Sequence, residues 1–324
     1  MRRGMSLLLS FVFAALAGGC AFVNVDVMPS PSPLQERVVE GEGKGKILII
    51  DITGMISEKE KSGGQLFGSK PSMVTHIKES LQKAERDDEL AGVILRINSP
   101  GGTVTASDIL YHEIVKFREK KKVPVAACII GLGASGGYYV ASAADEIVIH
   151  PTAVTGSIGV MVMNFNVEGL LAKVGVSEYT VKSADKKDFM SPFRAATEEE
   201  LKIMQTIIDS MYGRFIDVIN TRPGNSLEPE QIRTLADGRI YTAQQAVTAK
   251  LVDRIAYLDD LVLDMKKRAG KPDAKVITYH RRGDSKETIY SQAPGGAPQI
   301  NLININADWL EMVPTTEFLY LWKQ

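Results

Sequence analysis

The segment Gly131-Leu-Gly-Ala-Ser-Gly-Gly137 places a serine among glycines where an apolar, β-branched run ends. At a turn from a strand into a helix, the hydroxyl of Ser135 would face backbone N–H groups that have no partner within the helix. Such N–H groups can stabilise the oxyanion that forms when a serine attacks a carbonyl carbon. The segment is therefore typical of a serine nucleophile, although a glycine-rich turn with a serine N-cap fits the same residues.

Two other glycine motifs overlap this segment. A dinucleotide-binding fingerprint requires an acidic residue about 20 residues later, where the chain instead has Thr155-Gly-Ser157. The nucleophile elbow of an α/β-hydrolase requires a histidine after the serine. Only two of the four histidines follow Ser135, namely His150 before Pro151 and His280 in a weakly periodic region. A Ser-His esterase therefore stays open as an alternative with little support.

Lysine is another side chain that can activate a serine, because an uncharged amine accepts the hydroxyl proton. Burial favours the uncharged form of an amine, and so does a second positive charge nearby. Most lysines are nevertheless solvated surface residues, so the residue type alone does not identify a base.

Four motifs resemble, in order and spacing, those of signal peptide peptidase A. They are Asn98-Ser-Pro-Gly-Gly-Thr-Val104, Ala134-Ser-Gly-Gly-Tyr-Tyr139, Thr155-Gly-Ser-Ile-Gly-Val160 and Lys187-Asp-Phe-Met-Ser-Pro192. The resemblance extends from about Ile47 to Leu261. Shorter likenesses at 237–241 and 251–253 imply structural roles, and Lys250 stands where that family often has glycine.

The resemblance implies a role for each matching residue. Ser135 corresponds to the nucleophile and Lys187 to its general base, while Ser157 would hydrogen-bond and orient the lysine. The backbone N–H groups of Gly102 and Gly136 would form the oxyanion hole. The Lys-Asp-x-Met-Ser-Pro register is the reason for assigning the base to position 187 instead of its neighbour at 186.

The resemblance also implies a fold, a substrate class and an assembly. The fold would be the crotonase-like or Clp-protease-like α/β fold, built of repeated ββα units with a mostly parallel sheet. The substrates would be cleaved signal peptides and other short apolar peptides near the membrane, and the subunits would form a homo-oligomeric ring or dome. A scaffold of the same fold that binds peptides or membrane partners without cleaving them is a second alternative.

The periodicity of the chain independently predicts an α/β domain with a mostly parallel sheet, because short β-branched runs alternate with amphipathic segments. A capping box at Thr197 predicts the start of a long helix that Pro223 and Gly224 end. The expected strands are 46–53, 91–97, 123–130, 146–149, 177–182 and 251–255, and the shorter expected helices are 73–84, 106–120, 229–235 and 243–249, with another opening near 135.

The first 20 residues are typical of a targeting segment. Arg2 and Arg3 precede an apolar stretch from Leu7 to Ala17, which is too short for an ordinary spanning helix and leads through two glycines to Cys20. This pattern resembles the lipidation site of bacterial lipoproteins, with a retained signal anchor as the alternative. Both readings predict a catalytic domain exported to the extracytoplasmic side of a membrane. Prolines and glycines then predict a flexible tether over 21–45, followed by a peptidase domain over 46–270 and a C-terminal tail over 271–324.

Composition excludes several other classes of protein. The 324 residues carry a formal net charge of −1, so no overall positive charge attracts nucleic acid. The two cysteines, Cys20 and Cys128, offer no disulfide framework, and Cys128 is expected to fill core. The four scattered histidines predict no metal site, and no cofactor motif remains.

Overall fold

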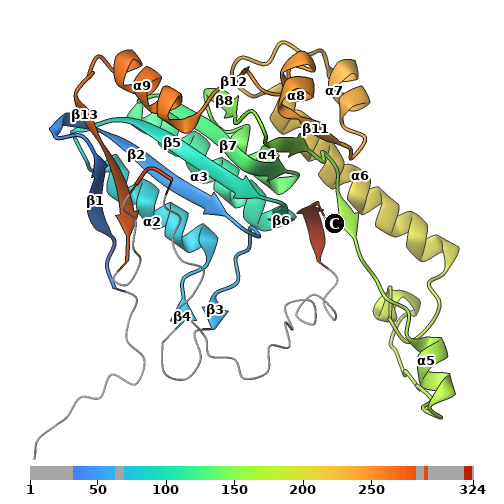
Figure 1. Cartoon of the computed structure of the whole chain (residues 1–324). Coiled ribbons are helices and arrows are strands. Elements are labelled where there is room, and N and C mark those ends of the chain that lie inside the picture. Colours follow the sequence, from blue (N-terminus) through green and yellow to red (C-terminus); the bar gives the residue numbers. More distant parts are fainter. Residues whose placement is uncertain (1–31, 63–68, 282–287, 291–316, 323–324) are drawn as a thin grey trace, which may run out of the picture.

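The computed structural model describes residues 32–62, 69–281, 288–290 and 317–322 (Figure 1). In these ranges nine strands form one sheet, whose main order is β1-β13-β2-β5-β7-β8-β12, with β9 and β11 attached beside β7. Its strands are β1 Gln35–Glu40, β2 Gly43–Thr53, β5 Leu90–Ser99, β7 Val125–Ala134, β8 Glu146–Ile149, β9 Val154–Gly156, β11 Ile240–Thr242, β12 Arg254–Ile255 and β13 Ala274–His280. A smaller sheet is formed by β6 Gly101–Thr103, β10 Met161–Val162 and β14 Phe318–Leu321, and a separate pair by β3 Lys61–Ser62 and β4 Ser69–Lys70.

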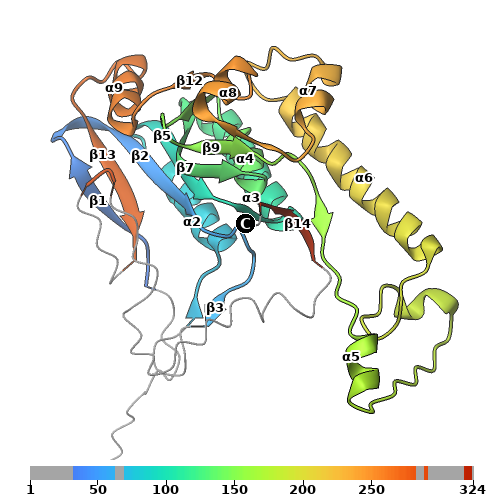
Figure 2. The same ribbon diagram turned by 45° about the vertical axis from the view of Figure 1, so that its right-hand side comes forward.

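The helices lie around this main sheet (Figure 2). They are α2 Met73–Glu85, α3 Val104–Lys121, α4 Gly136–Ala141, α5 Glu168–Lys173, α6 Glu198–Asn220, α7 Pro229–Leu235, α8 Ala243–Thr248 and α9 Leu258–Arg268, with a 3-10 turn η1 at Asp185–Asp188. The expected capping box of α6 is present, since the side chains of Thr197 and Glu200 each accept from the other residue's backbone N–H.

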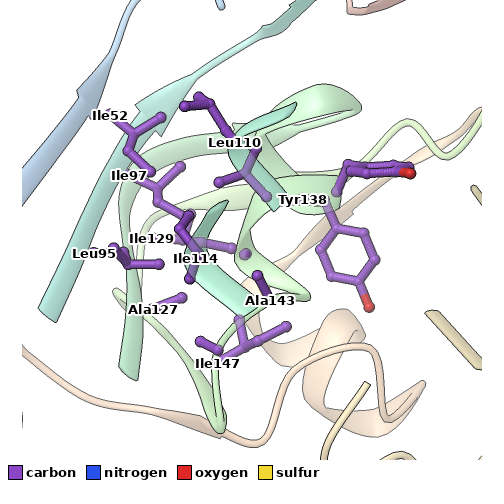
Figure 3. Close-up of a cluster of buried hydrophobic side chains, with 14 of the residues drawn as sticks. Ile52, Leu95, Ile97, Leu110, Ile114, Ala127, Ile129, Tyr138, Ala143 and Ile147 are labelled. Carbon is purple, nitrogen blue, oxygen red and sulfur yellow. The ribbon is translucent and has the colours of Figure 1, made fainter. Parts of the chain in front are cut away.

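The centre of the sheet is parallel and buried on both faces. β13, β2, β5, β7 and β8 run parallel to their neighbours in that order. Leu48 and Ile50 of β2 face the cluster that includes α2 and α3, whereas Ile47 and Ile49 face the cluster that includes α9. Figure 3 shows the larger cluster, in which α3 packs its apolar side chains against those of β5 and β7. This alternation explains why the strands are apolar without interruption. It confirms the expected α/β fold class.

The structure differs from the expected elements in three segments. Residues 35–40, expected within a tether, form edge strand β1, which pairs antiparallel with β13. β13 itself, expected within a tail, lies between β1 and β2 and is largely buried. Residues 177–182 form no strand, which makes that expectation wrong. Val181 is fully exposed and Tyr179 is 89% exposed, so the β-branched and aromatic residues there are not buried in a sheet.

An arm, defined here as residues 163–196, extends away from the sheet and from α4 before the chain returns at the start of α6 (Figures 1 and 2). It contains α5 and η1, and Met190 is its one buried residue. Phe165, Leu170, Val174 and Tyr179 expose about half or more of their surface. The arm therefore presents apolar side chains that a compact monomer would bury.

Candidate active site

Ser135 lies in a strained turn between β7 and α4. Its backbone angles are φ 51° and ψ −116°, a conformation that residues other than glycine rarely adopt. The turn is held from both sides, because the N–H of Ser135 donates to the carbonyl of Gly156 at 2.7 Å and its carbonyl accepts from the N–H of Tyr139 at 2.9 Å. The side chain is buried and forms no cap bond with α4. Packing thus imposes on the serine a conformation that its own preferences oppose.

The glycines around Ser135 allow backbone segments to approach closely. A Cβ atom on Gly137 would lie 2.8 Å from the carbonyl oxygen of Ser99, and one on Gly136 would lie 2.5 Å from the hydroxyl of Ser107. All six residues of α4 are buried. The first turn of α4 therefore packs directly on the end of β5, which leads into β6.

The two residues predicted for the oxyanion hole lie on neighbouring segments. A Cβ atom on Gly101 would lie 2.7 Å from the backbone nitrogen of Gly136, so the start of β6 passes beside the serine turn. A Cβ atom on Gly102 would lie 1.8 Å from the carbonyl oxygen of Ile56, which leaves no room for a side chain there. The backbone of Gly102 and that of Gly136 are thus brought together.

The strand β14 fills the space, called the groove below, between β6 and β10 beside these glycines. It runs antiparallel between β6 and β10, with Tyr320 paired to Gly102. The N–H of Trp322 donates to the carbonyl of Pro100 at 2.8 Å. The carbonyl oxygen of Tyr320 lies 1.9 Å from the position of a Cβ on Gly101 and 3.1 Å from that of one on Gly136. An extended peptide is therefore held by strand addition, with one carbonyl at the predicted oxyanion hole.

The side chain of Tyr320 fills an aromatic pocket. It is completely buried, with its ring stacked on Tyr139 at a centroid distance of 5.0 Å and tilted against Phe215 at 4.8 Å. Its hydroxyl donates to the carbonyl of Met211 at 2.8 Å, and burial raises the pKa of this hydroxyl above its usual range. Sequence reasoning missed this pocket, because its residues come from α4 and α6, far apart in the chain.

Ser157 lies close to the serine turn. β9 pairs with β7 so that Gly156 is opposite Ala134, and Gly156 also accepts the hydrogen bond from the N–H of Ser135. Ser157 follows with a positive φ of 51° and is buried, and its N–H donates to the main-chain carbonyl of Arg239 at 2.7 Å. Four of the five predicted residues, Ser135, Gly136, Gly102 and Ser157, therefore belong to one small region of backbone.

Within one chain, Lys187 does not lie with the other four predicted residues. It belongs to η1 on the arm and is exposed. Among the described residues, neither a hydrogen bond nor an ion pair involves its amine, and no hydrogen bond joins it to Ser135. The neighbouring Lys186 is different, because its amine is ion-paired with Glu199. Of the two lysines, residue 187 is the one whose amine is available to another group.

The two histidines that could serve as alternative bases, His150 and His280, make their contacts away from Ser135. The His150 ring packs edge-on against Tyr257 at 5.0 Å and its Nδ1 lies 3.0 Å from the hydroxyl of Thr152. His280 ends β13, which β2 and β5 separate from β7. In the described part of the chain, no hydrogen bond connects either ring to Ser135.

The described residues bear on some of the remaining predictions, which concern the two cysteines, metal sites and membrane-spanning helices. Cys128 is buried, and burial raises the pKa of its thiol to about 12, as expected of a core residue. Cys20 lies outside the described residues. Within the described ranges, no group of three or more potential ligands could hold a metal ion, and no helix is long and apolar enough to cross a bilayer.

Comparisons with known proteins give two family matches. The profile of peptidase family S49 matches residues 117–271, and that of Clp protease matches residues 67–154. The second match confirms the expected Clp-protease-like fold.

Individual relatives extend these matches. Over 245 residues the chain is 36% identical to an Enterococcus faecium protein named as signal peptide peptidase SppA, covering 76% of this chain and 70% of the relative. Over 215 residues it is 36% identical to a protein of Synechocystis sp. named as a protease, covering 66% and 71%. Protease 4 of Salmonella typhi is 33% identical over 218 residues, covering 67% of this chain but 34% of the relative. Because the chain is 36% identical to the Enterococcus faecium relative over 70% of that relative, and the S49 match includes both the serine turn and the arm, the chain is a serine peptidase and belongs to peptidase family S49.

Proposed function

We propose that the chain is a membrane-anchored endopeptidase that cleaves short apolar peptides, including signal peptides already released from their proteins, by Ser-Lys chemistry. The observation that carries this proposal is the position of β14. A peptide strand lies in the groove between β6 and β10, with one carbonyl oxygen against Gly101 and Gly136. A substrate bound in the same way would present its scissile carbonyl beside Ser135.

In this proposal each predicted residue has a role in the reaction. The uncharged amine of Lys187 takes the proton from the Ser135 hydroxyl, and the alkoxide attacks the peptide carbonyl. The N–H groups of Gly102 and Gly136 stabilise the negative oxygen of the tetrahedral intermediate. The resulting ammonium returns the proton to the leaving amine, and the same amine then activates the water that hydrolyses the acyl-enzyme. Ser157 orients the lysine amine.

The base comes from a second copy of the chain in this proposal. Ser135 is buried in the body, whereas Lys187 is on an arm that extends away from it. The exposed apolar side chains of the arm give a second subunit a surface to cover. Covering that surface would also remove the lysine from water, which favours the uncharged amine that the reaction needs. A homo-oligomeric ring or dome repeats this contact around a closed symmetry.

The groove supports the substrate class. Strand addition binds the main chain of an extended peptide, so it tolerates many sequences. The aromatic pocket at Tyr139 and Phe215 adds affinity for a large apolar side chain at the residue that supplies the scissile carbonyl. A peptide that is short, extended and apolar meets both requirements.

The sequence of the first 20 residues supports the location. An exported catalytic domain would be anchored through acyl chains on Cys20 or through a retained apolar segment. Intact-mass analysis of the N-terminal peptide from membranes distinguishes these two anchors. A mass equal to that of an unmodified, cleaved peptide would contradict both.

The catalytic proposal is tested with three proteins on a denatured apolar peptide. The wild type should hydrolyse the peptide and form a covalent adduct with a fluorophosphonate probe, whereas Ser135→Ala should do neither. Lys187→Ala should lose hydrolysis by at least about a thousandfold, as expected for loss of a residue of the catalytic unit. Retained hydrolysis in Lys187→Ala would favour the Ser-His alternative, and an inactive wild type would favour a peptide-binding scaffold.

A further inference from the structure

The turn that carries Lys187 is held by charge in place of apolar packing. Residues 172–187 are all exposed, so buried apolar packing near η1 is limited to Met190, two residues after its end. A general base must nevertheless be placed to within a fraction of an ångström of its proton donor. The hydrogen bonds around η1 must therefore supply that precision.

Arg194 connects η1 to the first turn of α6. Its Nε donates to Asp188 Oδ2 at 2.9 Å, and its Nη2 donates to Asp188 Oδ1 and to the main-chain carbonyl of Asp188, both at 3.0 Å. Its Nη1 and Nη2 also donate to the two carboxylate oxygens of Glu200, at 2.9 Å and 2.5 Å. One planar guanidinium thus binds two carboxylates, each through two nitrogens.

Both carboxylates are further restrained. Glu200 Oε2 accepts from the N–H of Thr197 at 2.8 Å in the capping box of α6, and the Glu200 side chain is 2% exposed. Asp188 Oδ1 also accepts from the amine of Lys182 at 2.8 Å, and that amine donates to the carbonyl of Asp185 at 3.1 Å. The residue after Lys187 is therefore tied through Arg194 to a rigid helix end and through Lys182 to the start of η1.

The electrostatics agree with this geometry. Hydrogen bonds from Arg194 hold the pKa of Asp188 below its usual range and lower the pKa of Glu200 to about 2. Hydrogen bonds from Glu200 and Asp188 raise the pKa of Arg194. All three groups are thus charged throughout the pH range in which a peptidase works.

We infer that Arg194 is a positioning residue for the catalytic lysine, acting through Asp188 and Glu200 to fix the turn from which Lys187 extends. This inference rests on the proposed Ser-Lys function. Its consequence is that an altered Arg194 leaves substrate binding intact, because β6, β10 and the aromatic pocket lie outside the network, but lowers the rate of the chemical step.

The chain offers a matched control on the same two elements. Glu199 precedes Glu200 on α6 and is ion-paired with Lys186, which precedes Lys187 on η1. This pair is exposed, at 45% and 68% for the two side chains, and exposed pairs contribute little. Glu199→Gln therefore removes one ion pair between η1 and α6 without touching Arg194.

The experiment measures kcat, KM and the pH dependence of kcat for Arg194→Ala, Arg194→Lys, Glu200→Gln and Glu199→Gln in the full-length protein. Arg194→Ala should lower kcat about a hundredfold, with KM within about twofold of wild type. The pH at which kcat reaches half its plateau should rise, because a lysine that is no longer held in place stays solvated and charged. Arg194→Lys and Glu200→Gln should lie between Arg194→Ala and wild type, and Glu199→Gln should match wild type.

The outcomes separate this inference from the function on which it rests. If Arg194→Ala has the kcat and pH profile of Glu199→Gln, Arg194 does not position the base. Should Arg194→Ala fail to fold, as judged by circular dichroism, Arg194→Lys and Glu200→Gln decide the matter by the same criteria. If Lys187→Ala retains activity in the same assay, the Ser-Lys function itself has failed, whatever Arg194 does.

Discussion

The serine region and the lysine arm are built on opposite principles. Ser135 is 1% exposed and lies between a buried strand and a helix whose six residues are all buried. Lys187 is exposed on an arm whose one buried residue is Met190 and whose order comes from ion pairs. Packing can store strain at the nucleophile, whereas charges hold the base on a surface that a partner can cover. Under the proposed function, one chain preorganises the nucleophile and the oxyanion hole, and assembly with a second copy completes the site.

Apart from replacing Ser135 or Lys187 themselves, the largest effect on activity is expected from adding a side chain to β6 at Gly102. In Gly102→Ala the new methyl group would lie 1.8 Å from the carbonyl oxygen of Ile56, so the backbone of β6 must shift and the N–H of residue 102 leaves its position. Loss of one oxyanion donor costs about 10²–10³ in kcat, and we expect a loss of this size in peptide hydrolysis. Gly213→Ala, with nothing within 4 Å of the new atom, is the control. Equal activities of the two variants would refute the role of Gly102.

Emptying the aromatic pocket is expected to have a smaller effect, which is an increase in the rate of peptide hydrolysis. Tyr320→Ala removes the buried ring that holds β14 in the groove, so an added peptide competes for the groove more easily. Truncating a buried aromatic side chain costs about 3–5 kcal/mol, and part of this loss weakens the binding of β14 in the groove. Because β14 then leaves the groove more often, we expect the initial rate of peptide hydrolysis to rise about tenfold. Phe318→Ala on the same strand, where the side chain is only partly buried, should change the rate less. An unchanged or lower rate in Tyr320→Ala would show that β14 does not restrict access.

Relief of the strain at Ser135 should stabilise the body. Ser135→Gly replaces a residue at φ 51° with one that tolerates positive φ, which recovers about 1–3 kcal/mol and loses about 1 kcal/mol of that to the greater freedom of the unfolded chain. The free energy of unfolding in urea should therefore rise by about 1 kcal/mol while activity disappears. Ser142→Gly, at an ordinary helical φ of −66°, should instead lower it. A less stable Ser135→Gly protein would mean that the turn carries no strain.

The smallest effect is the one expected of pH on the stability of the arm. The folded-state pKa of Asp188 is lowered, and that of Glu200 is lowered to about 2, so both carboxylates stabilise the fold above their unfolded pKa of about 4. That contribution decreases only as the pH falls through this range toward the folded-state values. Hydrogen exchange of residues 185–195, corrected for intrinsic rates, should thus give the same protection at pH 8 and pH 5 and less below about pH 4. A loss of protection between pH 8 and pH 5 would contradict the network.

The sequence predicted the body better than the arm, for physical reasons. The apolar runs that form β2, β5 and β7 are buried on both faces, so composition and period determined them. The run 177–182 looked like another strand because it contains Tyr179, Thr180 and Val181, residue types that favour strands, yet Tyr179 and Val181 are exposed and no sheet of the described residues covers them. β1 was missed because an edge strand needs hydrogen bonds to β13 and little burial.

The site itself was predictable only where its residues follow one another in a motif. Ser135 came from a local glycine pattern, whereas Gly136 and Lys187 were assigned from a family resemblance. Local sequence gives no signal for a pocket in which Tyr320 meets Tyr139 and Phe215. Lys250 shows the converse, since it adopts a φ of 58° at the position where glycine was expected, and the turn forms despite the side chain.

The central claim is that one subunit supplies Ser135 and another supplies Lys187, and mixing inactive subunits tests it most directly. Ser135→Ala and Lys187→Ala proteins, each inactive alone, are dissociated, mixed in equal amounts and reassembled, and peptide hydrolysis is measured. A site shared between subunits predicts that about one quarter of the sites in a random mixture regain an intact pair, and hence a similar share of wild-type activity. A mixture that stays inactive, although it reassembles to the size of the wild type, would contradict the account.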